Sequence, residues 1–558
     1  MRQLFGLFLK ISLKIGIAAL LAAFLLPKSL HSQQTPPAIE WQQSLGGSSI
    51  DNAYAITQTN DGGYIVAGSS TSSDGDVTRH RGLVDSWIVK LTSAGAIQWQ
   101  KSLGGSDHDY AYSIQQTSNG GYIIAGMSYS NDGDVSGNHG LSDCWIVQLT
   151  SAGGIEWQKT LGGSGSEEAT SIQQASDGGY IVAGWSQSTD GDVTGNHGSA
   201  DSSDDYWIVK LTSGGEVEWQ KSLGGSNYDR ASSIAQTSDG GYVVAGWSLS
   251  NDGDVTSHHG SADFSDFWLV KLTSAGAMEW QKSLGGSYPD YASSVVQTSD
   301  GGYIVAGWSQ SSDGDVTGHH GSADSTDAWI VKLTDAGVIQ WQRSLGGASD
   351  DYANSVEQTT DGGYIVAGWS SSIDGDVTGR HGSVATPDYW IVQLTSGGEI
   401  EWQKSLGGGR EDYANSIQQT TDGGYIVAGE SFSSAGDVTG HHGLSESPDC
   451  WIVKLTPPNP TGVKPTGLPT PSPWAMNANY PNPFSTTTTI TFTVPERSFV
   501  RLSVDTEQGV EVARLIEEQL EAGEYRVPFS GDGLASGTYL YRLTSGSTSL
   551  VGKMTVVR

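Results

Sequence analysis

Aspartate residues recur along this chain in a three-residue motif, Asp-Gly-Asp, that returns at nearly constant intervals. The motif occurs six times and supplies Asp74, Asp76, Asp132, Asp134, Asp190, Asp192, Asp252, Asp254, Asp313, Asp315, Asp374 and Asp376. At the seventh place in the series, Ala435-Gly436-Asp437 keeps only the second carboxylate. Two further acidic positions recur in all seven copies, at Asp51, Asp109, Glu167, Asp229, Asp290, Asp351 and Asp412 and at Asp85, Asp143, Asp205, Asp266, Asp327, Asp388 and Asp449.

These carboxylates have two explanations. Ca²⁺ favours several oxygen ligands, so three carboxylates that converge in each copy, together with loop carbonyls, could bind it. Asp beside Gly also caps its own loop, because its carboxylate accepts hydrogen bonds from nearby backbone N–H groups. The spacing does not match the EF-hand loop. The motif therefore predicts either calcium sites or self-capped loops, and calcium is the only cofactor that the sequence indicates.

Histidine and tryptophan recur in or beside the same loops. One place holds His139, His197, His259, His320, His381 and His442 in six copies, with Arg81 in the first. One His in each copy does not supply the three or four ligands of a zinc site, so we expect it to hydrogen-bond its own loop.

An Ala-Gly pair precedes Trp185, Trp247, Trp308 and Trp369 in copies three to six, where the other copies have Ser69, Met127 and Glu430. These four indoles could stack on sugar rings, or they could pack beneath the loop.

The loops belong to a unit of about sixty residues that is repeated seven times. In the fifth copy we expect strands at residues 293–298, 303–308, 329–334 and 338–345, joined by short turns such as Asp300-Gly301-Gly302. Four antiparallel strands in each copy predict an all-β fold, a seven-bladed β-propeller at residues 39–456. The region opens with a last-strand sequence and ends with a third strand, so its two ends should pair and close the ring. The alternative is an open solenoid.

The charge balance and the N-terminus restrict the partners and the destination of the chain. The net charge is -33, whereas binding a phosphate backbone needs clustered Lys and Arg, so we expect no nucleic acid partner. Lys10 and Lys14 precede an apolar run at residues 15–26 that is too short to span a bilayer comfortably. This pattern predicts a signal peptide at residues 1–32, and after its removal no transmembrane anchor in the mature chain.

The composition changes after a Pro-rich segment at residues 457–475, which predicts a semi-rigid linker. The next segment opens with Asn479-Tyr480-Pro481-Asn482-Pro483-Phe484, continues with Gly-Leu-Ala-Ser-Gly-Thr-Tyr-Leu-Tyr-Arg-Leu at residues 533–543, and ends in a Lys-Met strand. Residues 476–558 closely resemble the type A C-terminal sorting domain of the type IX secretion system of Bacteroidetes. The resemblance implies a small Ig-like β-sandwich. It also implies that the type IX machinery takes this protein from the periplasm across the outer membrane, for release or attachment to the cell surface.

The sequence thus predicts a secreted or cell-surface propeller that acts in binding or adhesion, with a glycan or matrix component as its expected partner. It contains no Gly-x-Ser-x-Gly, no His-Glu-x-x-His and no phosphate-binding loop before a helix. Active sites are asymmetric, whereas seven near-identical blades offer no unique acid, base or nucleophile. We therefore assign no catalytic residue and favour a protein without enzymatic activity. Two alternatives stay open, an extracellular polysaccharide-active enzyme and a purely structural surface protein.

Overall fold

The computed structural model describes residues 35–198, 203–261, 263–383, 386–443 and 446–458 and, with short gaps, residues 474–557. The predicted signal peptide (1–32) and most of the predicted linker (457–475) lie outside these residues. One compact unit contains Ile39–Thr456 and a second contains Pro457–Arg558. Every regular element in the described ranges is a β-strand, and no helix there is long and apolar enough to cross a membrane.

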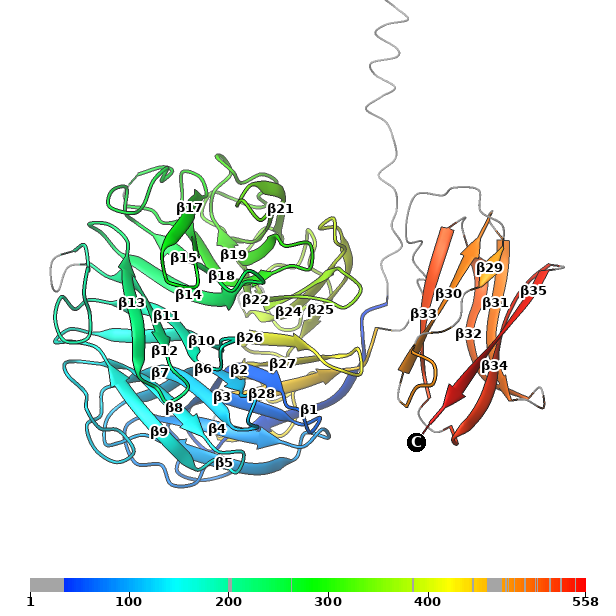
Figure 1. The fold of residues 1–558 in the computed structure, drawn as a ribbon, viewed down its shortest axis with the longest axis horizontal. Coiled ribbons are helices and arrows are strands. Elements are labelled where there is room, and N and C mark those ends of the chain that lie inside the picture. Colours follow the sequence, from blue (N-terminus) through cyan, green and yellow to red (C-terminus); the bar gives the residue numbers. More distant parts are fainter. Residues whose placement is uncertain are drawn as a thin grey trace, which may run out of the picture. The chain divides into compact units, whose positions relative to one another are not determined.

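The first unit is a ring of seven four-stranded antiparallel sheets, which confirms the predicted propeller (Figure 1). Blades 1 to 7 are numbered here by their innermost strands, which contact one another around the axis of the ring. These strands are β2 (Asp51–Gln58), β6 (Asp109–Gln116), β10 (Glu167–Gln174), β14 (Asp229–Gln236), β18 (Asp290–Gln297), β22 (Asp351–Gln358) and β26 (Asp412–Gln419).

The other three strands of each blade follow outward in chain order. The second strands are β3 (Tyr64–Ser70), β7 (Tyr122–Ser128), β11 (Tyr180–Ser186), β15 (Tyr242–Ser248), β19 (Tyr303–Ser309), β23 (Tyr364–Ser370) and β27 (Tyr425–Ser431). The third are β4 (Asp85–Leu91), β8 (Asp143–Leu149), β12 (Asp205–Leu211), β16 (Asp266–Leu272), β20 (Asp327–Leu333), β24 (Asp388–Leu394) and β28 (Asp449–Leu455). The outermost are β5 (Ile97–Leu103), β9 (Ile155–Leu161), β13 (Val217–Leu223), β17 (Met278–Leu284), β21 (Ile339–Leu345), β25 (Ile400–Leu406) and β1 (Ile39–Leu45).

The ring closes through its two ends, as the sequence predicted. Strand β1 pairs antiparallel with β28 and completes blade 7, with Ser44 opposite Trp451. The Trp451 indole N–H donates to Gln42 across this pair at 2.8 Å. Within blade 5, Trp329 donates to Gln342 at the same distance, so the closing strand reproduces the contact made inside an ordinary blade. Pairing the two ends removes two open sheet edges.

Burial explains why the repeat keeps its apolar pattern. The second and third strands of each blade are buried on both faces, because each sheet packs between two neighbours. In the core between blades 5 and 6, Ile304 and Ile330 of one sheet pack against Val366 and Trp390 of the next. Except for β25, the outermost strands are buried only at their C-terminal ends, which accounts for their polar Gln and Lys residues. The apolar clusters therefore lie between blades, and no blade has a core of its own.

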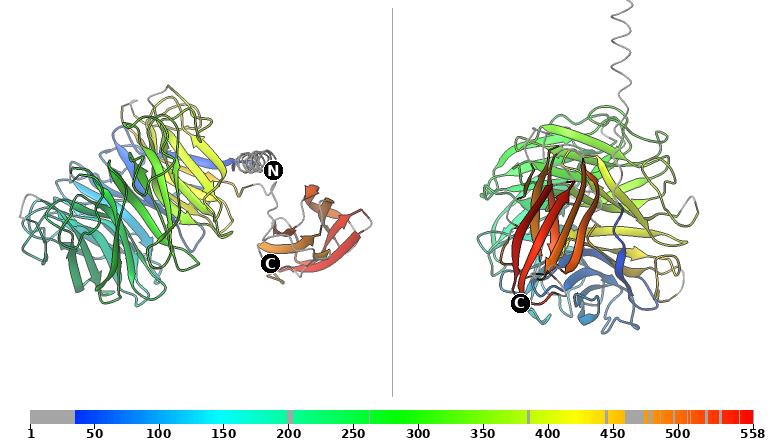
Figure 2. Two further views of the ribbon diagram at one scale, coloured as in Figure 1. Left: turned by 90° about the horizontal axis from the view of Figure 1, so that it is seen from above. Right: turned by 90° about the vertical axis from the view of Figure 1, so that its right-hand side faces the viewer.

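The second unit is a β-sandwich, in agreement with the prediction for residues 476–558 (Figure 2). One sheet contains β29 (Ala475–Met476), β30 (Thr487–Val494) and β33 (Gly523–Ser530). The other contains β31 (Ser498–Thr506), β32 (Glu511–Leu520), β34 (Gly537–Ser545) and β35 (Thr548–Val556). Their inner faces enclose one apolar core that includes Phe492, Val504 and Tyr541.

The Asn-Tyr-Pro-Asn-Pro-Phe motif joins the two sheets of the sandwich. Asn479 is 3% exposed, and its side-chain amide donates to Thr488 Oγ1 at 2.8 Å. Its backbone N–H donates to the Tyr541 hydroxyl at 3.1 Å. The Phe484 side chain lies in the core, and its backbone N–H donates to Thr555 O. The motif thus has a structural role within this domain.

Candidate functional site at the axis of the propeller

The Asp-Gly-Asp motifs lie in the long loops between the second and third strands of each blade. Each long loop packs against the entry loop, which is the Gly-Gly loop before the innermost strand of the same blade. In blade 5, Asp313 Oδ1 accepts the Ser287 N–H at 2.8 Å and Oδ2 accepts the Ser287 hydroxyl at 2.6 Å. Asp315 accepts the Gly285 N–H at 3.4 Å, while its own N–H donates to Gly285 O. The bonds from Ser287 lower the pKa of Asp313. These are the bonds expected of self-capped loops.

The recurrent carboxylates gather around the Gly-Gly pair of each entry loop. In blade 5, Asp290 Oδ2 accepts the Gly286 N–H at 2.9 Å. Asp266 of the preceding blade also lies beside this pair, so the carboxylates that meet here come from two neighbouring copies of the repeat. Among the described residues, no three or more His, Cys, Asp or Glu side chains are arranged to hold a metal ion. Calcium binding therefore stays a prediction.

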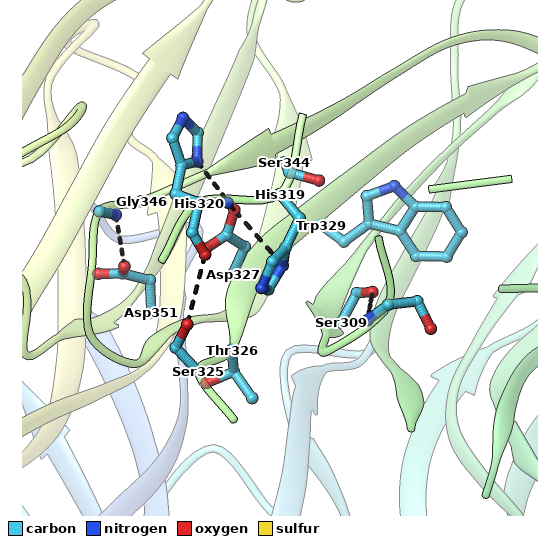
Figure 3. Close-up of polar contacts among 12 residues, drawn as sticks. Ser309, His319, His320, Ser325, Thr326, Asp327, Trp329, Ser344, Gly346 and Asp351 are labelled. Atoms are coloured by element: carbon cyan, nitrogen blue, oxygen red, sulfur yellow. Dashed lines mark hydrogen bonds and ion pairs between the residues drawn. The ribbon is translucent and has the colours of Figure 1, made fainter. Parts of the chain in front are cut away.

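Each recurrent histidine hydrogen-bonds the aspartate that begins the third strand of its blade, as Figure 3 shows for His320 and Asp327. The backbone N–H and the Nδ1 of His320 both lie 2.8 Å from Asp327 Oδ2, and Asp327 is fully buried. Burial raises the pKa of Asp327, and the bonds from His320 offset part of that shift. The same pair forms between His139 and Asp143, His197 and Asp205, His259 and Asp266, His381 and Asp388, and His442 and Asp449. The His is thus bonded locally, to an aspartate whose role as partner the sequence analysis had not identified.

The four tryptophans share one ring of positions with other variable side chains. Each sits on a second strand, opposite the second residue of the innermost strand of the same blade. From blade 1 to blade 7 the pairs are Asn52 with Ser69, Tyr110 with Met127, Glu168 with Trp185, Arg230 with Trp247, Tyr291 with Trp308, Tyr352 with Trp369, and Tyr413 with Glu430. This ring surrounds the axis at the end that carries the long loops.

In blades 4 to 7 these side chains form a continuous row, called here the aromatic arc. Ring centres are 5.0 Å apart for Trp247 and Tyr291, 4.2 Å for Tyr291 and Trp308, 5.1 Å for Trp308 and Tyr352, 4.0 Å for Tyr352 and Trp369, and 5.4 Å for Trp369 and Tyr413. Pairs within a blade are stacked, whereas pairs between blades are tilted or, for Trp369 and Tyr413, edge-on. All six rings are partly exposed. The indoles therefore pack against tyrosines, with part of each ring left at the surface.

Ionisable groups stand at both ends of the arc. At the blade 4 end, the Arg230 guanidinium lies over Trp185, 4.1 Å from the ring centre. At the blade 7 end, Glu430 lines a cavity of about 540 Å³ together with Tyr413 and Phe432. Burial raises the pKa of Glu430 to about 7. Burial also raises the pKa of Glu168 to about 7, although the charge of Arg230 opposes the shift.

Sequence reasoning found the four tryptophans but missed the tyrosines, Arg230 and Glu168. The sequence did contain a signal for this site. The positions in this ring vary strongly from copy to copy, whereas most other strand positions stay nearly the same. Blades 1 and 2 differ again, since Tyr54 and Tyr112 occupy a place that is small or polar in the other copies. Their ring centres are 5.2 Å apart. The sevenfold repeat is therefore asymmetric at the axis.

A second ring of positions lies toward the other end of the axis. Gln115, Gln173 and Gln418 each accept a backbone N–H of the next blade at 2.6 Å. In blade 6 the same place holds Glu357, which accepts the Gln419 N–H at 2.6 Å. Burial raises the pKa of Glu357 to about 6. The carboxyl group thus occupies a site that blades 2, 3 and 7 fill with an amide.

Replacing this carboxyl group with the amide should stabilise the propeller at neutral pH. The folded state holds the Glu357 proton more tightly than the unfolded chain, so wild-type stability falls as pH rises from the unfolded pKa to the folded one. Above about pH 6, where Glu357 is ionised in the folded state, this effect lowers the free energy of unfolding of wild type by at most about 2 kcal/mol. We expect Glu357→Gln to unfold later than wild type in urea at pH 7.5 and to match it at pH 4.5. If the variant and wild type were equally stable at both pH values, burial of Glu357 would not cost stability at neutral pH.

Comparison with known proteins decides the identity of the second unit. Residues 478–557 match the family model described as a secretion system C-terminal sorting domain. The β-sandwich is a type IX secretion sorting domain. A sorting domain of this family implies recognition by the type IX machinery and export across the outer membrane, to the cell surface or the medium.

The propeller is similar to several known proteins at low sequence identity. The regulatory protein FlaEY of Caulobacter vibrioides is 23% identical over 418 residues, covering 67% of this chain and 42% of that protein. Sqt1 from Chaetomium thermophilum is similar in structure at 12% identity and a TM-score of 0.39, covering 75% of this chain and 100% of the other. PorZ of Porphyromonas gingivalis, a surface component of the type IX secretion system, has a TM-score of 0.28 and 11% identity. The similarity covers 89% of this chain and 64% of PorZ. At these levels of similarity, none of them assigns an activity to this propeller.

Proposed function

We propose that this exported propeller binds a glycan of the cell surface or matrix at the aromatic arc and has no enzymatic activity. One observation carries the proposal. The seven blades share one pattern of core residues and nearly the same loop-capping residues, yet the ring of positions around the axis departs from the repeat and concentrates aromatic side chains on one side. A purely structural ring would have no need of this asymmetry.

The chemistry of the arc supports a carbohydrate ligand. Partly exposed Trp and Tyr rings offer apolar surface to the C–H faces of sugars, and the hydroxyl and indole groups at their edges can hydrogen-bond. The cavity beside Tyr413 and Glu430 adds a concave polar end. The net charge of -33 disfavours polyanionic ligands. For the route, we propose that the signal peptide at residues 1–32 delivers the chain to the periplasm before the sorting domain directs it outward.

A binding screen on the purified protein tests this function. We expect at least one polysaccharide to bind wild type, and Trp308→Ala to weaken that binding about tenfold, because a stacking surface at the centre of the arc is lost. Trp280→Ala is the matched control. Trp280 lies on β17, the outermost strand of the adjacent blade 4, and is also partly buried; its ring centre is 5.7 Å from that of Tyr303 in blade 5. A screen in which no glycan binds would leave the purely structural function in its place.

The same screen addresses calcium. Because the Asp-Gly-Asp oxygens already accept hydrogen bonds, we expect a chelator to leave both binding and the melting temperature unchanged. A chelator that lowers either one would favour calcium in these loops over self-capping.

A second candidate, a polysaccharide-cleaving enzyme, has one observation in its favour. Glu168 and Glu430 both have pKa values of about 7, which suits a general acid at neutral pH. Incubating wild type with any glycan that binds, and measuring new reducing ends, separates the two functions. New ends that disappear in Glu168→Gln or Glu430→Gln would establish the enzyme.

A further inference from the structure

A polar cluster lies where the arc begins, between blades 3 and 4. Arg230 is held between two indoles, with its guanidinium carbon 4.1 Å from the ring centre of Trp185 and 5.8 Å from that of Trp247. Its Nε donates to Asp204 Oδ2. Within the described part of the chain, Nη1 and Nη2 make no hydrogen bond, and the side chain is 35% exposed. Two donors in a fixed, planar geometry therefore remain available.

Two acceptors beside Arg230 also lack partners. Asp204 is fully buried, and its Oδ1 has no hydrogen-bond partner among the residues that the structure describes. Glu168 makes no hydrogen bond to any described residue, and the charges of Arg230 and Asp204 both act on it. Buried polar atoms are almost always hydrogen-bonded, because an unpaired one costs free energy. Donors and acceptors left open together, at the rim of a binding surface, indicate a ligand that supplies both.

We propose that Glu168, Asp204 and Arg230 bind the hydroxyl groups of one neutral sugar residue, which makes a neutral polysaccharide the ligand of the arc. This inference rests on the proposed glycan-binding function. A hydroxyl both donates and accepts, so a pair of adjacent sugar hydroxyls can accept from the Arg230 fork and donate to the two carboxylates. The charge of Arg230 is already balanced by Asp204, and Glu168 lies beside it. Uronic acids and sulfated sugars would therefore be repelled.

The test compares two Arg→Lys variants on a panel of neutral, uronic-acid and sulfated oligosaccharides, using the purified protein. Arg230→Lys keeps the charge but removes the planar pair of donors, so we expect its affinity for the best neutral ligand to fall about tenfold or more. Arg343→Lys is the control. Arg343 also lies over an indole, 5.6 Å from the centre of Trp341, and pairs with Glu399, but it sits on the outermost strand β21. We expect it to bind as wild type does.

Added salt and thermal unfolding complete the design. Affinity for a neutral ligand should change less than about twofold when the salt concentration is raised, because no net charge is bound. Both variants should melt within a few degrees of wild type. Preferential binding of acidic sugars, or full affinity in Arg230→Lys while wild type binds a glycan, would overturn the neutral-sugar site and leave the general function standing. No binding by wild type would remove both.

Discussion

Removing strand β1 (Ile39–Leu45) is expected to abolish the cooperative fold of the propeller. Without it, blade 7 loses its outermost strand and β28 presents an open edge. Leu45 also leaves the core between blades 7 and 1, where it packs near Val66 and Ile452. Lost packing and backbone pairing together should cost on the order of 5 kcal/mol or more, which is comparable with the whole stability of many domains.

Circular dichroism and analytical ultracentrifugation of the deletion variant give the measurement. We expect loss of the thermal transition and association through the open edge. A synthetic peptide with the sequence of residues 36–46 should restore the transition when added in trans, whereas a scrambled peptide should not. A deletion variant that melts as wild type does would show that the ring does not depend on this closure.

The second large effect is expected from Gly307→Ala. In every blade the innermost strand carries a bulge opposite a glycine of the second strand, as between Ala292 and Ser294 in blade 5. A Cβ at Gly307 would lie 2.0 Å from Tyr291 O and 2.8 Å from the Phe267 ring, so the backbone of β18 would have to move. We expect a loss of about 3 kcal/mol or more, read as a lower urea midpoint.

The matched control for this substitution is Gly409→Ala. A Cβ there would meet nothing within 4 Å, and blade 6 already has Ala348 at the same place. Its stability should stay within about 0.5 kcal/mol of wild type. Because the carbonyl in question belongs to Tyr291 of the arc, Gly307→Ala should also weaken glycan binding in the fraction that folds. A Gly307→Ala protein with an unchanged midpoint would mean that the bulge can relax at little cost.

Much of this fold follows from the sequence alone. The period of the repeat, its Asp-Gly-Gly turns and its alternation of apolar and polar residues are local signals, and they place the strands to within a few residues. In the fifth copy the expected strands at 293–298 and 303–308 correspond to β18 (Asp290–Gln297) and β19 (Tyr303–Ser309). Ring closure could also be predicted, because β1 and β28 are complementary fragments of one blade. The sorting domain was evident from motifs such as Asn479-Tyr480-Pro481.

The site depended on the tertiary structure, because its members come from different copies. Asp266 and Asp290 come from neighbouring blades and both lie beside Gly285, a proximity that exists only once the blades pack side by side. The arc likewise consists of contacts such as Trp308 with Tyr352, 5.1 Å apart across a blade junction. Sequence periodicity fixes which way a side chain points from its own strand. Only the closed ring determines which residue of the next blade that side chain contacts. For this reason the aromatic residues could be recognised in the sequence, whereas their arrangement as the aromatic arc could not.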